Sequence, residues 1–427
     1  MIETISTAVG CSPSKRDSVR STKTRADAAL EAAMDSAASA PLEIGNGFTP
    51  RSAAFWRFHD PLLLGVAATL TALGLVMVAS ASTAIAENNY GDPLALFWRQ
   101  SIHVLAGLAV MILVACIPLA RLSRISPILL IASIVLLVLV LIPGIGHEVK
   151  GSARWIRFGS LGIQPSEFAK LGVLLFFASY LSRRGLEVRT SFFGLFKAFL
   201  VILLVCPLLL AEPDYGAAAV LIATVFGMLF LAGVPMMRFV ITTASLVAVM
   251  GILALLAPYR VQRIMSFTDP FADPFGSGFQ LVQALIAIGR GGFFGVGLGE
   301  SVQKLFYLPE AHSDFLFSMM AEELGLVSMI AVVVLYTVFM LRSLAIGYRA
   351  RKSGLVFGAY AAWGIGLLIG IQAGINIGVN MGLLPTKGLT LPLMSYGGSS
   401  FLACAAGVGI LARVERERRM LCMRGAS

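Results

Sequence analysis

Apolar residues occur in long runs along this chain, and short polar segments separate the runs. A helix that crosses the hydrocarbon core of a bilayer needs about 20 mainly apolar residues. Stretches of this kind, some interrupted by glycine or proline, cover residues 61–81, 102–120, 125–145, 166–181, 193–210, 217–232, 239–257, 315–341, 355–379 and 399–411. The pattern predicts an all-α polytopic membrane protein with about ten transmembrane helices.

Composition and charge support this fold class and orient the chain in the membrane. Hydrophobic residues make up 57% of the 427 residues and charged residues only 13%, whereas soluble domains carry about 25% charged residues. The net charge of +10 would suggest nucleic acid in a soluble protein. Here the basic residues gather in every second connection, such as Arg121 and Arg124 or Arg349 and Arg351. We therefore expect no nucleic-acid partner, two cytoplasmic termini and an extracytoplasmic segment 258–313.

The two ends of the chain differ from its middle. Residues 1–57 are rich in Ser, Thr and Ala without a core-forming apolar face, so they are predicted to be a mostly disordered cytoplasmic tail. Residues 58–412 are predicted to form the membrane domain, and residues 413–427 a basic cytoplasmic tail. The five cysteines lie in tails or apolar runs, which predicts no disulfide.

The connection between the third and fourth predicted spans is unusually basic for its side of the membrane. It reads HEVKGSARWIRFGSLGIQPSEFAK and carries Lys150, Arg154 and Arg157. Cations at this place indicate an anionic partner such as a phosphate or pyrophosphate; lipid headgroups are the alternative. Trp155 could serve as an interfacial anchor.

The same connection leads into a helix start with two charged residues close to the hydrocarbon. Gln164 and Pro165 are typical of a first turn. Glu167 and Lys170 stand three residues apart. An unpaired charge at this depth would cost roughly 2.5–3.5 kcal/mol, so the two should pair and face inward. Whether the pair is structural or functional stays open. Further along, AEPDYG at 211–216 holds two carboxylates that could bind a metal or share a proton, or simply form a turn.

Two polar segments are candidates for the chemistry. The first, 258–313, combines the turn-forming pairs Asp269-Pro270 and Asp273-Pro274 with many glycines and enough phenylalanines to fold. The second, PTKGLTLPLMSYGGSS at 385–400, breaks an apolar region. Irregular backbone at membrane depth is tolerated only where it is buried in protein or lines a cavity. With the hydroxyls of Ser395 and Ser399 and the cation of Lys387, this segment is predicted to be the wall of a cavity open to the outer leaflet.

Four segments resemble those of the SEDS family (shape, elongation, division and sporulation), and its FtsW-type division branch more than its RodA-type branch. They are KGSARWIRFGSLGIQPSEFAKL, AEPDYGAAAVL, ADPFGSGFQLVQALIAIGRGGFFGVGLGESVQKLFYLPEAHSDFLFSMMAEELG and GLLPTKGLTLPLMSYGGSS. The resemblance covers about residues 60–415. It implies a ten-helix peptidoglycan glycosyltransferase of the bacterial inner membrane that polymerises lipid II at the division septum. It also implies a class B penicillin-binding transpeptidase and other membrane proteins of the division machinery as partners.

The resemblance implies which residues carry the reaction. The family's essential aspartate falls on Asp273, with Asp269 as its nearest rival. Asp273 would be the general base for the acceptor hydroxyl or a ligand of a weakly held divalent cation, Mg²⁺ or Mn²⁺. The candidates for neutralising phosphate charge are Lys150, Arg154, Arg260, Arg263 and Lys387. Further substrate-binding candidates are Trp155, Gln164, Glu167, Lys170, Gln283, His312, Ser395 and Ser399.

Two other functions use the same features differently. A transporter of lipid II would pass the anionic headgroup through the same cavity along the same cations. Transporters commonly contain inverted repeats with sites at the bilayer midplane, whereas no repeat is evident here and the polar residues crowd the outer face. A non-catalytic scaffold that recruits the transpeptidase would not require Asp273.

The alternation of basic connections can be tested by labelling. In a variant without the native cysteines, Ser277→Cys should react from outside the cell with a membrane-impermeant maleimide, and Ser353→Cys should react only after permeabilisation. The reverse pattern would contradict the predicted topology.

Overall fold

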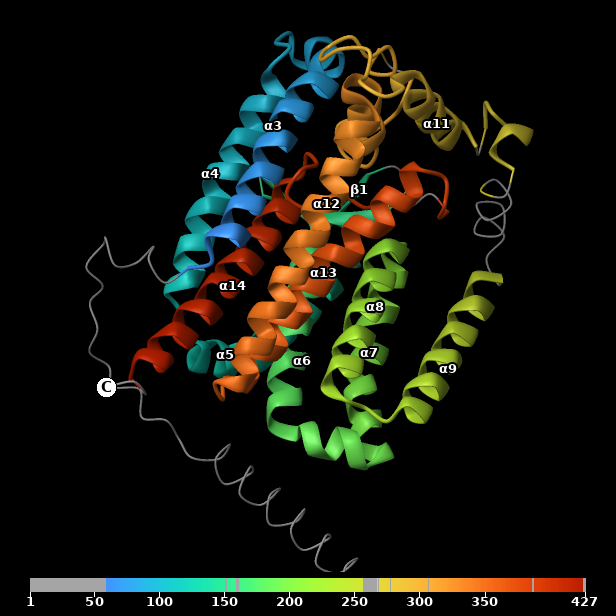
Figure 1. Ribbon diagram of the computed structural model, residues 1–427. Coiled ribbons are helices and arrows are strands. Elements are labelled where there is room, and N and C mark those ends of the chain that lie inside the picture. Colours follow the sequence, from blue (N-terminus) through green and yellow to red (C-terminus); the bar gives the residue numbers. More distant parts are fainter. Residues whose placement is uncertain are drawn as a thin grey trace, which may run out of the picture. The chain divides into compact units, whose positions relative to one another are not determined.

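The computed structural model describes residues 59–149, 152–158, 161–255, 267, 269–276, 278–305, 307–385 and 388–424. A helix lies at each of the ten predicted spans: α3 (Pro61–Tyr90), α4 (Ala95–Cys116), α5 (Leu119–Val140), α6 (Pro165–Thr190), α7 (Phe192–Ala211), α8 (Tyr215–Ala232), α9 (Met236–Leu255), α12 (Leu316–Lys352), α13 (Val356–Asn380) and α14 (Gly398–Arg424). Within the described residues, all of these except α6 and α9 are long and apolar enough to cross a membrane by length and composition alone. The predicted all-helical, multi-pass fold class is confirmed (Figure 1).

Several helices run beyond the apolar stretches that predicted them. α3 begins after Asp60, whose carboxylate accepts a hydrogen bond from Leu63 N at 3.2 Å, and ends at Gly91 in the left-handed region. α14 continues through residues 413–424, which the sequence assigned to a basic tail. Helix ends follow capping groups and side-chain contacts as well as the hydrocarbon boundary, so hydropathy alone misplaces them.

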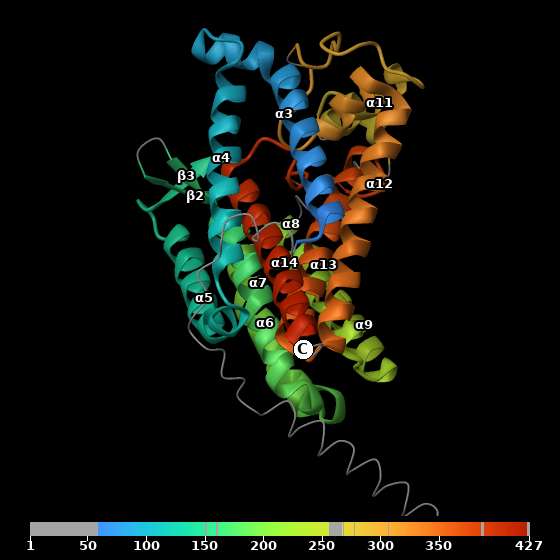
Figure 2. The ribbon, with the colours of Figure 1, turned by 60° about the vertical axis from the view of Figure 1, so that its left-hand side comes forward.

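A small antiparallel sheet is the one kind of element that the sequence analysis did not expect. Strands β1 (Gly146–Val149), β2 (Ser152–Phe158) and β3 (Leu161–Ile163) occupy the basic connection between α5 and α6, in the order β1-β2-β3. Ile156 on β2 faces Gly146 on one side and Ile163 on the other, and it is buried. The sheet contacts α5, α6 and α14, and Figure 2 shows it above the upper end of α5.

Helix α13 is central to the packing. It contacts α12, α6, α8 and α14, and many of its residues are glycine or alanine. A Cβ added at Gly366 would lie 2.5 Å from the Cβ of Ser343 on α12, so the two helices can approach this closely only with glycine there. Small residues are the usual means of close helix packing in membranes.

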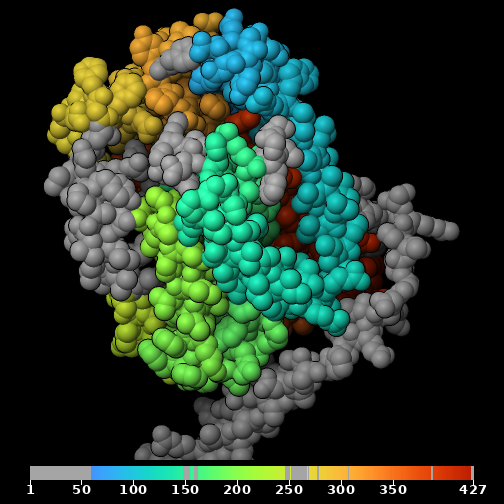
Figure 3. Space-filling model, turned by 180° about the vertical axis from the view of Figure 1, so that it is seen from behind, coloured from blue at the N-terminus to red at the C-terminus, as the bar shows by residue number. Residues whose placement is uncertain are grey.

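Many outward-facing side chains on the peripheral helices are apolar. On the face seen from behind, α5 and α7 contribute much of the surface (Figure 3). Large exposed hydrophobic residues there include Ile128, Ile131, Leu200, Leu203 and Leu204. Such a surface suits contact with lipid chains and would be unusual facing water.

Buried carboxylates join the ends of α3, α12 and α14 on the predicted cytoplasmic side. Asp60 is buried and lies 2.7 Å from Arg342 and 3.3 Å from Arg349. Glu415 is fully buried and contacts Arg349, Arg418 and Arg419 at 3.8, 2.8 and 2.7 Å. A buried charge is tolerated where ionic partners satisfy it, so this cluster fixes the three helix ends together.

Loss of the Glu415 charge should destabilise the folded protein. Glu415→Gln removes the anion that three arginines share, and we expect the free energy of unfolding to fall by about 1–3 kcal/mol. The measurement is thermal unfolding in detergent. Glu187→Gln is the matched control, because its carboxylate also has two basic partners, Arg184 and Lys197, but lies at the surface. Equal losses in the two variants would contradict a special role for the buried cluster.

Candidate functional site

The start of α6 joins three segments that are far apart in the sequence. Gln164 precedes the helix; its backbone N–H donates to Ser399 Oγ of α14 at 3.0 Å, and its side-chain amide donates to Ser166 Oγ at 3.1 Å. Ser166 in turn donates to Asp214 in the turn between α7 and α8 at 2.9 Å. The predicted site residues Gln164 and Ser399 are therefore in direct contact.

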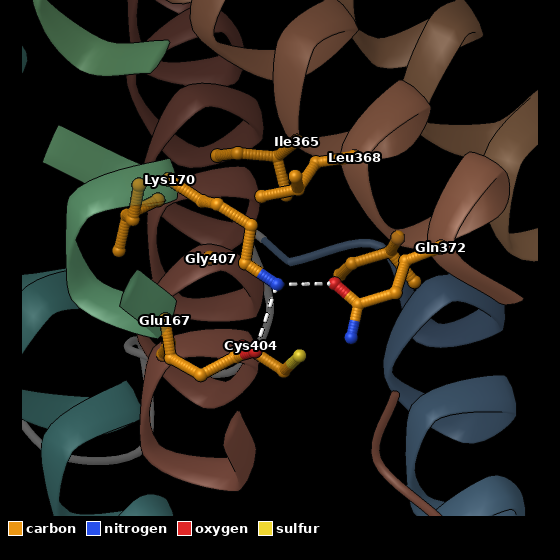
Figure 4. Close-up of a pocket in the computed structure, with 10 residues that line it drawn as sticks. Glu167, Lys170, Ile365, Leu368, Gln372, Cys404 and Gly407 are labelled. Carbon is orange, nitrogen blue, oxygen red and sulfur yellow. Dashed lines mark hydrogen bonds and ion pairs between the residues drawn. The ribbon is translucent and has the colours of Figure 1, made fainter. Parts of the chain in front are cut away.

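Glu167 and Lys170 form the predicted ion pair inside the protein. Their charged atoms are 2.8 Å apart, and both side chains are buried. Lys170 also donates to Gln372 Oε1 of α13 at 2.6 Å (Figure 4). The prediction that the two charges pair and face inward is confirmed, and Gln372 is a partner that the sequence analysis missed.

A cavity adjoins this ion pair between α6, α13 and α14. Polar side chains line one part of it and aliphatic side chains the rest (Figure 4). The lining residues are Glu167, Lys170, Leu171, Ile365, Leu368, Ile369, Gln372, Ala403, Cys404 and Gly407. Segment 385–400, which was predicted to be a cavity wall, is not among these residues.

Arg154 is held by backbone oxygens in the turn between α7 and α8. From strand β2 its Nε donates to the Glu212 carbonyl at 3.0 Å and its Nη2 to the Pro213 carbonyl at 2.6 Å. Within the described part of the chain it forms no salt bridge with a carboxylate. Its Nη1 lies near Gly388, since a Cβ added there would be 3.9 Å from this nitrogen and 3.2 Å from Asp314 Oδ2. The guanidinium is thus oriented by two neutral carbonyls, with the carboxylate of Asp314 nearby.

The two carboxylates of AEPDYG have different surroundings. Asp214 accepts a hydrogen bond from Ala217 N at 3.1 Å and so caps α8, as a turn residue would. Glu212 is fully buried, and neither carboxylate oxygen has a hydrogen-bond partner. Burial, with a smaller contribution from the charge of Asp214, raises the pKa of Glu212 to about 8 despite the nearby Arg154. At pH 7 Glu212 is therefore mainly protonated.

Segment 388–397 is irregular, and side chains of α13 and α4 form hydrogen bonds with its backbone. Gln372 donates to the Thr390 carbonyl at 3.1 Å and Asn376 to the Leu389 carbonyl at 2.5 Å. On α4, Gln100 bonds the Ser395 carbonyl at 3.4 Å and Gly397 N at 3.3 Å. Ser395 itself is buried and accepts from Leu391 N at 2.9 Å. Of the two options that the sequence left for this backbone, burial within the protein applies to residues 389 and 391–395, and Thr390 is half-buried.

The end of the segment that was predicted to be extracytoplasmic lies against this irregular stretch. Tyr396 N donates to the His312 carbonyl at 3.0 Å, and the two rings are 5.4 Å apart. The Asp314 carbonyl accepts from the side chains of Asn376 and Asn380 at 2.8 and 3.0 Å. Gln372, Asn376 and Asn380 recur every fourth residue along α13, and this spacing of amides in an apolar helix is the signal that could have found them.

Asp273 lies in a different part of the outer segment. It follows the 3₁₀ turn η1 (Pro270–Ala272), is exposed, and its carbonyl accepts from Gly276 N and Gly278 N at 3.4 and 3.2 Å. Its carboxylate lies over Gly276, where a Cβ would be 2.2 Å from Asp273 Oδ2. Helix α11 (Phe279–Gly291) follows, with the half-buried Gln283 on it. Asp269, the rival aspartate, stands exposed at the other end of η1.

The remaining predicted site residues fall into two groups. Trp155 neighbours Arg154 on β2 and packs against Gly162 of β3, whose added Cβ would be 3.3 Å from the indole ring. Lys150, Arg260, Arg263, Lys387 and the N-terminal segment 1–57 lie outside the described residues. Among the residues that are described, no group of three or more His, Cys, Asp or Glu side chains is arranged to hold a metal ion.

Known proteins resemble this chain over most of its length. "Probable peptidoglycan glycosyltransferase FtsW" of Thioalkalivibrio sulfidiphilus is 54% identical over 356 residues, which cover 83% of this chain and 89% of that protein. The protein of the same name from Pseudomonas fluorescens is 50% identical over 359 residues, covering 84% and 88% of the two chains.

Solved structures share the fold. A chain of a peptidoglycan synthase complex that coordinates polymerization and crosslinking is 32% identical, with a TM-score of 0.71, covering 85% of this chain and 99% of that one. The rod shape determining protein RodA of Thermus thermophilus is also 32% identical, with a TM-score of 0.62 and coverage of 85% and 98%. The family profile described as "Cell cycle protein", for FtsW, RodA and SpoVE, matches residues 60–420. The chain belongs to this cell cycle protein family, the SEDS proteins.

Proposed function

We propose that this protein is a peptidoglycan glycosyltransferase that polymerises lipid II during septal cell-wall synthesis. The observation that carries the proposal is an identity of 50% or more, over more than four fifths of the chain, to relatives named as such enzymes. The geometry around Arg154 supports it, because an oriented cation with no salt bridge to a carboxylate among the described residues suits a lipid-linked pyrophosphate.

The reaction needs one proton acceptor and a way to neutralise phosphate charge. The C4 hydroxyl of the acceptor sugar attacks the anomeric carbon of the donor, the new C–O bond forms, and the bond to undecaprenyl pyrophosphate breaks. We assign the hydroxyl proton to the Asp273 carboxylate, which is exposed and held over Gly276. Pyrophosphate is already a good leaving group, so no carboxylic acid needs to protonate it.

Arg154 is assigned to the charge on the pyrophosphate oxygens. The carbonyls of Glu212 and Pro213 fix its guanidinium plane, so little ordering is left to occur when an anion binds. Because Glu212 is mainly protonated at pH 7, it does not compete as an anion for this guanidinium. Lys150, Arg260, Arg263 and Lys387 are further candidates for the same task.

A divalent cation would fit only as a weakly held ligand. Mg²⁺ commonly binds one or two carboxylates together with waters and substrate phosphates, and the exposed Asp273 can supply one such carboxylate. When bound there, Mg²⁺ or Mn²⁺ would neutralise charge on the leaving pyrophosphate.

Partners and location follow from the same relatives. We propose a class B penicillin-binding transpeptidase as partner, in line with the similar chain that belongs to a peptidoglycan synthase complex. We place the protein in the bacterial inner membrane at the division septum, with both termini in the cytoplasm and with other membrane proteins of the division machinery nearby.

Transport of lipid II is the second candidate function. The observation that favours it is the buried Glu167–Lys170 pair, because ionisable residues within membrane helices often mark a transport path. The two functions differ in their need for Asp273.

Asp273→Asn should therefore abolish polymerisation while the protein still folds. The change keeps the shape and removes the proton acceptor, and loss of a general base typically lowers the rate ~10²–10⁴-fold. The measurement is glycan-strand formation from lipid II by the purified protein with its transpeptidase partner. Asp269→Asn, at the other end of η1, is the matched control and should have a much smaller effect. A parental rate in Asp273→Asn would overturn the catalytic assignment and favour transport.

Arg154→Ala should weaken use of the lipid-pyrophosphate substrate more than it lowers the melting temperature. Loss of hydrogen bonds to a charged group costs about 1.5–3 kcal/mol, or roughly a 10- to 100-fold rise in KM. Arg157→Ala is the control, because this exposed arginine lies on the same strand. Unchanged lipid II kinetics in Arg154→Ala would show that Arg154 does not bind the substrate and has a structural role instead.

A further inference from the structure

Helix α12 breaks at Gly325, and the chain that follows α11 bonds to the break. Gly325 has φ 72° and ψ −171° inside the helix. Across the break, Val296 N donates to the Glu322 carbonyl at 3.0 Å, Gly297 N to the Glu323 carbonyl at 3.1 Å, and Leu326 N to the Gly292 carbonyl at 3.0 Å. A Cβ at Gly295 would lie 2.1 Å from the Glu323 carbonyl oxygen, so the two segments are in direct backbone contact.

The side chain of Glu322 adds a second attachment at the same place. Its carboxylate is fully buried and accepts from Arg290 Nη1 at 2.9 Å, from Val302 N at 3.2 Å and from Ser301 Oγ. Arg290 is in the last turn of α11, and Ser301 and Val302 belong to the following loop. One carboxylate therefore holds the end of α11 and a loop about ten residues further on.

Glu323 anchors the opposite side. Its carboxylate accepts from Ser80 Oγ of α3 at 2.6 Å and lies 3.9 Å from Lys304 Nζ. An unpaired buried carboxylate would cost several kcal/mol. If the segment that follows α11 left α12, Glu322 would lose Arg290, Ser301 and Val302 as partners, and Glu323 would lose Lys304. Figure 1 shows α11 and the following loop beside the upper part of α12.

Helix α11 connects this anchor to Asp273. The backbone bond from Gly278 N to the Asp273 carbonyl links the Asp273 turn to the helix start, and Arg290 stands at the other end. A 13-residue helix is about 20 Å long. A rotation of roughly 3° at the Arg290 end would therefore move the Asp273 end by ~1 Å, and a misplacement of this size can cost about 10²-fold in rate.

We propose that Glu322 is a positioning residue for Asp273, acting through its ion pair with Arg290 at the far end of α11. The proposal rests on the proposed function, because it presumes that Asp273 takes part in the reaction. Glu322 does not touch substrate; it sets the direction in which α11 presents the Asp273 turn.

The test uses the full-length protein with Glu322→Gln, Arg290→Gln and Arg290→Lys. In polymerisation of lipid II, Glu322→Gln and Arg290→Gln should lower kcat roughly 10- to 100-fold and leave KM within about twofold, because substrate contacts are unaffected. Arg290→Lys keeps the ion pair and should stay within about threefold of the parental kcat. The Arg290 side chain is 43% exposed, so its variants test the proposal even if Glu322→Gln folds poorly.

A second readout separates positioning from general loss of stability. A spin label on Phe275→Cys, in a background without the native cysteines, reports mobility beside Asp273 at a site that is 88% exposed. Its mobility should rise in Glu322→Gln and Arg290→Gln but not in Glu415→Gln, a buried carboxylate variant at the other end of the membrane domain. Unchanged mobility, or an unchanged kcat in Arg290→Gln, would overturn the proposal.

Failure of the positioning proposal can be distinguished from failure of the catalytic assignment. If Asp273→Asn abolishes polymerisation and Arg290→Gln does not slow it, the positioning proposal fails alone. If Asp273→Asn polymerises at the parental rate, the proposed role of Asp273 fails, and positioning of that residue fails with it whatever the label shows.

Discussion

The need to satisfy every buried polar group without water is the constraint on which this structure depends. A lipid-facing helix meets it with its own backbone hydrogen bonds, but any irregular segment must find partners elsewhere in the protein. Segment 388–397 finds them in Gln372, Asn376 and Gln100. The break at Gly325 finds them in the backbone of residues 292–297. Each departure from helix therefore attaches to a particular neighbour, and these attachments give the outer side of the protein its shape.

How much of this could be predicted from sequence depends on the range of the interaction. The ten helices follow from local runs of apolar residues, and the Glu167–Lys170 pair follows from a spacing of three along one helix. The sheet at 146–163 was not predicted from the sequence. Its strands are short, and the basic residues of this connection were interpreted by their charge and not by the alternation of side chains along a strand. The bonds from Arg154 to the carbonyls of Glu212 and Pro213 join residues almost 60 positions apart, and no local pattern encodes them.

The same limit explains which site residues were missed. Glu322 and Glu323 lie in the apolar stretch 315–341. The mean hydropathy of this stretch is that of an ordinary membrane span, so it does not reveal the two carboxylates. Two adjacent carboxylates at this depth were nevertheless a detectable anomaly, because burial of each requires a partner. Those partners, Arg290 and Ser80, come from α11 and α3, so only the tertiary structure could identify them.

Two arginines of the predicted outer side, Arg154 and Arg290, show how local pairing separates binding from positioning. Arg290 forms an ion pair with the buried carboxylate of Glu322, and that ion pair holds α11 in place. Arg154 donates hydrogen bonds to two neutral carbonyls, and its neighbour Glu212 is mainly protonated at pH 7. A cation that is oriented by neutral dipoles can still attract an anionic ligand strongly. The attraction of a cation for a ligand is much weaker when an anion is already paired with it. Arg154, which forms no salt bridge with a described carboxylate, is therefore the one suited to a pyrophosphate, and the paired Arg290 is suited to fixing the segment that carries Asp273.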